Sequence, residues 1–177
     1  MPVPNAKQLH YINFSTTTAC FIGFALSLYS LLVEINIERN PTYTPMCDIS
    51  PSMSCTKAFG SQYGKGFGII GKLLGEKHGL NQPNSLYGMA FYTLCFFITM
   101  VDMRTAVNIM IGLAILSNLA SLYLASLLIF VLQDFCIVCV STYFVNATLL
   151  FLSMYKKRVL FGASNIKSEK SSHAKED

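Results

Sequence analysis

The chain has 177 residues and a formal net charge of +4, and 53% of its residues are hydrophobic while only 12% are charged. Soluble domains carry roughly 25% charged residues, so the composition excludes an ordinary soluble domain, and we expect no nucleic-acid partner. The shortage of charge is concentrated in a few long segments, which indicates a protein embedded in a lipid bilayer.

Four segments contain no Asp, Glu, Lys or Arg: residues 11–33, 85–101, 106–131 and 135–155. A membrane-spanning helix needs about 20 residues, with a range of about 17–25, so all four qualify, the second with little to spare. Helices of a soluble core would show a polar face, which these segments lack. We therefore predict an all-α membrane protein: a four-transmembrane-helix bundle forming one domain over residues 1–155, with a disordered tail over residues 156–177.

The loop between the first two spans covers residues 34–84 and is the one long connection. Four spans place both termini on one side of the membrane and the first and third loops on the other. The basic cluster YKKR, residues 155–158, lies directly at a membrane exit, and Arg104 lies in the short second loop. Basic residues at span ends favour the cytosolic side. Five basic residues in the long loop oppose this, but most lie far from span ends. We expect cytosolic termini and a luminal cap formed by the long loop.

Four of the six cysteines are predicted to lie on one side of the membrane. Cys47 and Cys55 are in the long loop, and Cys136 and Cys139 open the fourth span. Span parity places these pairs together whichever way the chain is inserted. A lumen is also a compartment in which disulfides persist. Cys20 and Cys95 fall inside spans and are predicted to be packing residues.

The Cys-x-x-Cys pair has the spacing of a redox centre at a helix start. Residues three apart share a helix face, so the two sulfurs can form a disulfide. Asp134 is the predicted N-cap, and the helix dipole favours a thiolate. Cys139 lies roughly 4.5 Å deeper than Cys136. Cys136 therefore suits exchange with the loop cysteines, and Cys139 suits attack on an electrophile in the bilayer, with Tyr143 on the same face to donate a hydrogen bond.

Other interpretations of these cysteines remain open from the residues alone. The pair can be an inert disulfide or two buried thiols, and the four cysteines can bind zinc, although no His is nearby. A four-span junctional protein of the claudin kind also has two loop cysteines. Such proteins carry Trp near them, whereas this chain has none. The second cysteine pair on the same side favours an electron relay.

The polar and glycine-rich segments near the spans carry weaker signals. GFGIIG, residues 66–71, fits a dinucleotide-binding pattern, but no strand precedes it, so we assign the match to chance. The longer GKGFGIIGKLLG predicts an amphipathic piece on the membrane surface that caps a pocket. Asn84 begins the second span as either its cap or a ligand. Asn118 and Asn146, inside spans, are expected to hydrogen-bond between helices.

Several motifs together resemble the vitamin K epoxide reductase family: CDISPSMSC (47–55), KGFGIIGKLLG (65–75), LNQPNSLYG (80–88) and SLYLASLLIFVLQDFCIVCVSTY (121–143). The resemblance implies a multi-pass enzyme of the endoplasmic reticulum membrane. It would reduce vitamin K 2,3-epoxide to the quinone, and the quinone to the hydroquinone, with thiols. The alternative within the family is a quinone-dependent oxidase that makes disulfides for luminal protein folding.

The resemblance also implies a role for individual residues. Cys136 and Cys139 match the catalytic pair, with Cys139 acting on the substrate. Cys47 and Cys55 match a shuttle pair that a luminal thioredoxin-like oxidoreductase reduces. No metal or tightly bound cofactor is implied, because the quinone is the substrate and an external dithiol the reductant. The implied substrate-binding residues are Asn84 and Tyr143, which hydrogen-bond the substrate oxygens, together with Phe59, Tyr63, Tyr87, Phe91, Tyr92, Leu124 and Leu132.

Two of these positions depart from the vertebrate pattern of the family. Tyr63 stands where that pattern has Trp, and Tyr87 stands where it has Phe. Both substitutions keep an aromatic ring and add a hydroxyl. The resemblance still implies the same chemistry, but it does not imply that this chain is sensitive to warfarin-type inhibitors.

Overall fold

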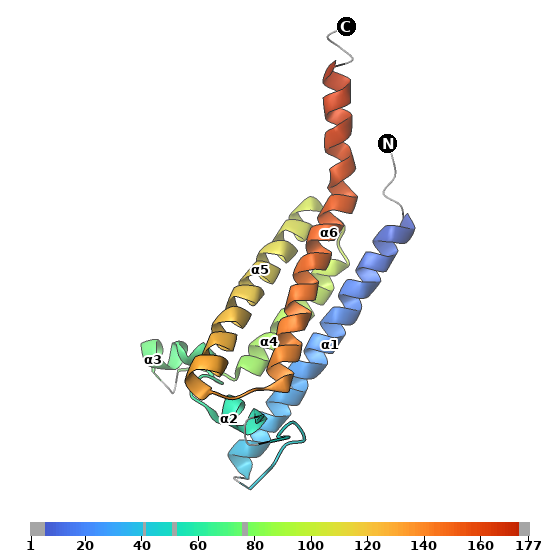
Figure 1. The fold of residues 1–177 in the computed structure, drawn as a ribbon. Helices are drawn as coiled ribbons and strands as arrows, with labels where there is room; N and C mark the ends of the chain where they lie inside the picture. The colour runs from blue at the N-terminus through green and yellow to red at the C-terminus, as the bar shows by residue number, and fades with distance from the viewer. Residues whose placement is uncertain (1–5, 41, 51–52, 76–77, 174–177) are drawn as a thin grey trace.

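The computed structural model describes residues 6–40, 42–50, 53–75 and 78–173, with side chains up to residue 161. Its long helices are α1 (Ala6–Arg39), α4 (Asn84–Thr99), α5 (Arg104–Leu127), extended by the π-helical turn η2 (Leu128–Leu132), and α6 (Ile137–His173). In Figure 1 they lie side by side in one bundle, in which α1 contacts α4 and α6, and α5 contacts α4 and α6. The described parts of the chain contain helices and no strand, which confirms the predicted all-α class.

Three of the described helices are long and apolar enough to cross a membrane. They are α1, α5 together with η2, and residues Ile137–Phe161 of α6. Helix α4 corresponds to the second predicted span and has only 16 residues, so that span, and with it the total of four, stays a prediction. Large apolar side chains cover the outer faces of the long helices, among them Phe14, Phe21, Leu32, Leu116, Leu119, Leu122, Phe144 and Phe151. An apolar outer surface of this kind fits a lipid environment.

Helix α6 extends well beyond the bundle at the end that carries both termini (Figure 1). We expected disorder from residue 156, whereas the structure continues the helix through His173. The first turn past the predicted span is fixed to the bundle: Lys156 Nζ donates to the Thr99 carbonyl at 2.9 Å and lies 2.7 Å from Asp102 Oδ1. The segment that follows has one Gly and no Pro, and its Lys, Ala and Glu residues favour a helix.

A close contact and a polar network join the helices in the core. Gly23 of α1 faces Tyr92 of α4, and a Cβ at Gly23 would lie only 2.3 Å from the Tyr92 ring. Tyr92, 1% exposed, donates to Asn146 Oδ1 of α6 at 2.8 Å. Asn146 in turn donates to Ser121 Oγ of α5 at 2.9 Å, and Asn118 donates to the Asn146 carbonyl at 3.0 Å. The predicted interhelical bonding of Asn118 and Asn146 is confirmed.

The segment between α1 and α4, residues 40–83, is called the cap loop below. It covers the end of the bundle away from the two termini (Figure 1) and contains α2 (Cys55–Gly60), the 3-10 turn η1 (Gly66–Gly68) and α3 (Ile70–Leu74). Gly66, Phe67 and Gly68 have φ values of 52°, 57° and 69°, a left-handed run that favours glycine. A Cβ at Gly68 would lie 2.3 Å from the Tyr63 ring. The GFG part of GFGIIG is therefore a tight turn that reverses the loop, and the residues from Ile70 on begin α3.

Candidate active site

A cavity of about 300 Å³ lies between the long helices and the cap loop. Apolar and aromatic side chains make up most of its wall, as in pockets for small apolar molecules. The structure brings together at this cavity all nine side chains that were predicted to bind substrate: Phe59, Tyr63, Asn84, Tyr87, Phe91, Tyr92, Leu124, Leu132 and Tyr143. They come from the cap loop, α4, the α5–η2 segment and α6, so only the folded bundle makes them neighbours.

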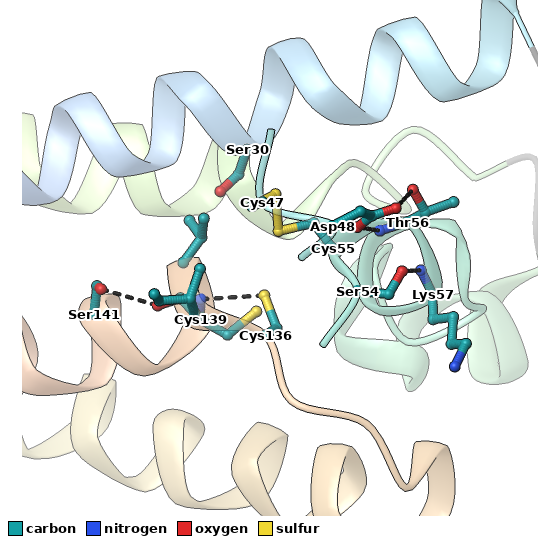
Figure 2. Close-up of a disulfide and its surroundings, with 12 residues drawn as sticks. Ser30, Cys47, Asp48, Ser54, Cys55, Thr56, Lys57, Cys136, Cys139 and Ser141 are labelled. Atoms are coloured by element: carbon teal, nitrogen blue, oxygen red, sulfur yellow. Dashed lines mark hydrogen bonds between the residues drawn. A yellow bond between two sulfur atoms is a disulfide. The ribbon is translucent and has the colours of Figure 1, made fainter. Parts of the chain in front are cut away.

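The two cysteines of the Cys-x-x-Cys pair face different surroundings. Cys139 lines the cavity, whereas Cys136 is not among the lining residues. Cys136 is fully buried and packs in one cluster with Cys47 and Cys55. Those two form a disulfide, and Figure 2 shows Cys136 beneath it at the start of α6. The thiol pair therefore connects the loop disulfide on one side with the cavity on the other.

Cys136 itself provides the N-cap of α6. Its Sγ accepts a hydrogen bond from the Cys139 backbone N–H at 3.3 Å (Figure 2), and its carbonyl accepts from Val140 N–H at 3.0 Å. The amide bond and the positive end of the helix dipole both favour negative charge on this sulfur. The expectation that Asp134 caps the helix is wrong, because the sulfur already occupies that position. Both oxygens of Asp134 are buried without a hydrogen bond from the described residues, and Lys57 Nζ lies 4.0 Å away.

A hydrogen-bonded clamp surrounds the loop disulfide. Asp48, next to Cys47, accepts from Thr56 N–H at 3.1 Å and from Thr56 Oγ1 at 2.6 Å, and Thr56 follows Cys55 (Figure 2). Burial by itself would raise the pKa of Asp48, but the hydrogen bonds from Thr56, Ser54 and Cys55 outweigh it and lower that pKa. The carboxylate is therefore ionised at neutral pH. The clamp holds the disulfide in a fixed position above Cys136.

The other two cysteines belong to the helix core and not to the cavity. Cys20 of α1 and Cys95 of α4 are buried free thiols in one cluster with Tyr92 and Leu149. Their predicted role as packing residues is confirmed.

Asn84 attaches the cap loop to α4. Its Oδ1 accepts from Phe67 N–H at 2.8 Å, and its Nδ2 donates to the Tyr63 carbonyl at 2.6 Å. The N-cap position of α4 is Pro83, without a side-chain bond, so the interpretation of Asn84 as a helix cap is wrong. An amide group can make four hydrogen bonds. One N–H and one oxygen lone pair of Asn84 therefore remain for a ligand in the cavity.

Removing this attachment is expected to open the cap loop. Asn84→Ala leaves the Phe67 N–H and the Tyr63 carbonyl without partners, at about 1–3 kcal/mol for each buried group. We expect faster hydrogen exchange of residues 63–67 in the full chain in detergent, with α5 and α6 unchanged. Gln82→Ala is the control, because Gln82 is exposed in the same loop and its side chain donates to the Gly79 carbonyl, while the backbone bond from Gly66 to Gln82 is kept. Equal exchange in the Asn84→Ala variant and the wild type would contradict this role.

The two tyrosines that depart from the family pattern both make contacts with cap-loop residues. The Tyr87 hydroxyl donates to the Leu80 carbonyl, and its ring lies 5.6 Å from that of Phe67. The Lys72 ammonium lies over the Tyr63 ring, 5.4 Å from its centroid. Tyr87 thus keeps its ring on the cavity while its hydroxyl bonds back to the loop.

A polar stripe on α1 was missed by sequence reasoning. Ser27, Ser30 and Glu34 all line the cavity. Their i, i+3, i+7 spacing puts them on one helix face, and this signal was present in the sequence. We had placed Glu34 in the long loop, because it follows the charge-free run, whereas α1 continues to Arg39.

Comparisons with known proteins agree with the arrangement of these residues. The model of the vitamin K epoxide reductase family matches residues 15–154, which include both cysteine pairs. The vitamin K epoxide reductase complex subunit 1 of Rattus norvegicus is 44% identical over 137 residues, covering 77% of this chain and 85% of the rat protein. Its counterpart in Mus musculus is 42% identical with the same coverage.

Proposed function

The chain belongs to the vitamin K epoxide reductase family, and we propose on that basis that it reduces vitamin K 2,3-epoxide to the quinone, and the quinone to the hydroquinone. One observation carries the proposal: Cys139 lines an apolar cavity while Cys136 packs against a loop disulfide. A redox centre that takes electrons from an external dithiol and passes them to a substrate in the cavity needs one cysteine facing each of the two. The quinone is a substrate, the reductant is a dithiol, and no tightly bound cofactor is required.

Electrons enter at the cap loop. A thioredoxin-like oxidoreductase of the lumen reduces the Cys47–Cys55 disulfide. The Cys55 thiolate then attacks Cys136 in the oxidised Cys136–Cys139 pair, which forms a Cys55–Cys136 disulfide and releases Cys139 as a thiolate. Cys47 next attacks Cys55, which re-forms the loop disulfide, and its proton passes to Cys136, which is released as a thiol. The packing of Cys55 and Cys136 in one buried cluster supports this order of transfer.

The substrate is reduced in the cavity. Cys139 attacks the quinone ring or the opened epoxide, and Tyr143 and the remaining amide hydrogen of Asn84 stabilise the negative charge that develops on oxygen. Cys136 then attacks Cys139, which restores their disulfide and releases the product. The apolar wall supports this step, because charge–dipole interactions are stronger where water is excluded.

The membrane arrangement that fits this chemistry has four spans, with α4 as the short second one. The termini are cytosolic, residues 1–155 form one domain, and the cap loop faces the lumen of the endoplasmic reticulum. The exposed Leu73 and Leu74 of α3 support an amphipathic contact of the cap with the membrane surface. A lipid-soluble quinone reaches the cavity from the bilayer, and the protein dithiol reaches the disulfide from the lumen.

The direct test uses microsomes that contain the full chain. Vitamin K epoxide is supplied with dithiothreitol, and quinone and hydroquinone are measured by chromatography, with microsomes lacking the chain as the control. We expect both products. A chain that is inactive on the epoxide but reduces a simple quinone would instead favour the disulfide-making oxidase. Absence of both reactions in a folded, membrane-inserted chain would overturn the proposal.

A further inference from the structure

One carboxyl group in the cavity has no part in the mechanism above. Glu34 of α1 is 4% exposed and lines the cavity. Its Oε2 accepts a long hydrogen bond of 3.4 Å from Ser85 Oγ, at the first turn of α4. Its Oε1 is buried and has no hydrogen-bond partner among the described residues. Ser85 follows Asn84, so Glu34 lies at the end of the cavity that the cap loop covers.

The cation that acts on Glu34 is already paired with another carboxylate. Lys65 of the cap loop forms an ion pair with Glu38, one helical turn beyond Glu34, and both side chains are about half exposed. The hydrogen bond from Lys65 to Glu38 raises the pKa of Lys65, so Lys65 stays charged. The charges of Lys65 and Glu38 act on Glu34 in opposite directions. Within the described part of the chain, Glu34 therefore forms no ion pair of its own.

The other titratable groups around the cavity do not supply a positive charge. They are Tyr63 of the cap loop, Tyr87 and Tyr92 of α4, and Cys139 and Tyr143 of α6. A buried carboxylate oxygen without a donor is energetically costly. A protonated carboxyl group, in contrast, has an O–H of its own to donate to a molecule in the cavity. The surroundings of Glu34 thus favour a protonated carboxyl group that donates a hydrogen bond to a ligand in the cavity.

We propose that Glu34 is the proton donor to the bound quinone, an inference that rests on the function proposed above. A para-quinone has two carbonyl oxygens on opposite sides of its ring, and both must gain a proton. Asn84 and Tyr143 lie on α4 and α6. Glu34 lies on the α1 wall, which carries neither of them, and can therefore serve the second oxygen.

The step balances with the residues on the cavity wall. The Cys139 thiolate forms a C–S bond to the quinone ring, and Glu34 gives its proton to the oxygen that becomes negative. The Cys136 thiol then attacks Cys139: the S–S bond forms, the C–S bond breaks, and the electron pair passes to the ring. The proton of Cys136 goes to the other oxygen. The quinone has been reduced by two electrons, the dithiol oxidised to a disulfide, and the Glu34 carboxylate recovers a proton from water.

The test measures quinone reduction by the full chain in detergent, with phylloquinone and dithiothreitol, over a range of pH. Glu34→Gln keeps the size of the side chain and a hydrogen-bond donor but cannot give up a proton. We expect kcat to fall about 100-fold, as for loss of a general acid, with KM within about twofold. The wild-type rate should fall at high pH as Glu34 loses its proton, and this fall should be absent from the Glu34→Gln profile.

Two further variants make the result decisive. Glu38→Gln is the matched control, because it removes an exposed carboxylate of the same helix; it should keep the wild-type kcat at low pH and retain the high-pH fall, moved to lower pH because the negative charge beside Glu34 is lost. Glu34→Asp retains an acid one methylene shorter and should recover kcat to within about tenfold of wild type, with the high-pH fall retained. An unchanged kcat in Glu34→Gln, or a loss through KM alone, would overturn the proposal. So would a folded Glu34→Asp variant that lacks the high-pH fall. If wild type fails to reduce phylloquinone, the proposed function fails instead.

Discussion

The Cys139→Ala variant is expected to lose reduction of both the epoxide and the quinone, by roughly 1,000-fold or more. Cys139 is the thiol of the Cys-x-x-Cys pair that lines the cavity. No other cysteine lines it, and the remaining free cysteines, Cys20, Cys95 and Cys136, are buried elsewhere in the described structure. A substrate held in the cavity would then meet no nucleophile. The measurement is thiol-driven formation of quinone and hydroquinone in microsomes.

Cys20→Ala is the matched control for this variant. It removes a buried free thiol from the helix core, away from the cavity, and should retain activity within about twofold after correction for the amount of folded protein. The thiol of Cys136 remains in Cys139→Ala, so a surviving activity would show that Cys136, or no cysteine at all, attacks the substrate. In either case Cys139 would not have the proposed role of attacking the substrate.

Replacing Cys47 or Cys55 by alanine is expected to slow turnover driven by a protein reductant much more than turnover driven by dithiothreitol. Cys136 is fully buried and packs beneath the loop disulfide, so a folded protein partner cannot reach it directly. With a thioredoxin-like protein as the only reductant, we expect turnover of Cys47→Ala and of Cys55→Ala to fall about 100-fold. With dithiothreitol, a small dithiol that enters past the loosened cap loop, turnover should stay within about tenfold of wild type.

The same assay distinguishes electron transfer from simple loosening of the cap. Asp48→Ala removes the hydrogen bonds to Thr56 but keeps the disulfide, so it should loosen the loop while protein-driven turnover largely survives. Full protein-driven activity in both cysteine variants would show that Cys136 receives electrons without the loop pair. Loss of activity with both reductants would show instead that the disulfide is needed for the cavity itself.

Much of the fold could be predicted because a bilayer imposes simple rules. A segment in lipid must satisfy its backbone hydrogen bonds internally, so each long charge-free run predicts a helix. The runs at residues 11–33, 106–131 and 135–155 correspond to α1, to α5 with η2, and to α6. The helix ends were less predictable, because they depend on local contacts. Helix α1 passes Glu34 to reach Arg39, and α6 continues past Tyr155, where Lys156 is held by Thr99 and Asp102.

The neighbours in the site were predicted only in part. Spacing along a helix relates Cys136 to Cys139, and span parity relates them to Cys47 and Cys55, since both arguments need only order along the chain. The nine substrate-binding positions came from resemblance to a family, because no sequence period links Phe59 of the cap loop with Leu124 of α5. The structure places all nine around one cavity, and their roles there are open to the experiments above.

By itself, the sequence determined that the chain is a helical membrane protein, because that depends on composition. It also predicted that the two cysteine pairs lie near one another, because span parity needs only order along the chain, and the structure packs Cys136 with Cys47 and Cys55. Tertiary structure alone decided what each polar group faces. The left-handed turn at Gly66–Gly68 brings the Phe67 amide to Asn84, which makes Asn84 an anchor of the cap loop and not a helix cap. The sulfur of Cys136, and not the carboxylate of Asp134, caps the start of α6. Glu34, at the edge of an apolar run, lies inside the cavity because the cap loop and α4 close over it, and burial of a polar group is a property of its neighbours in space.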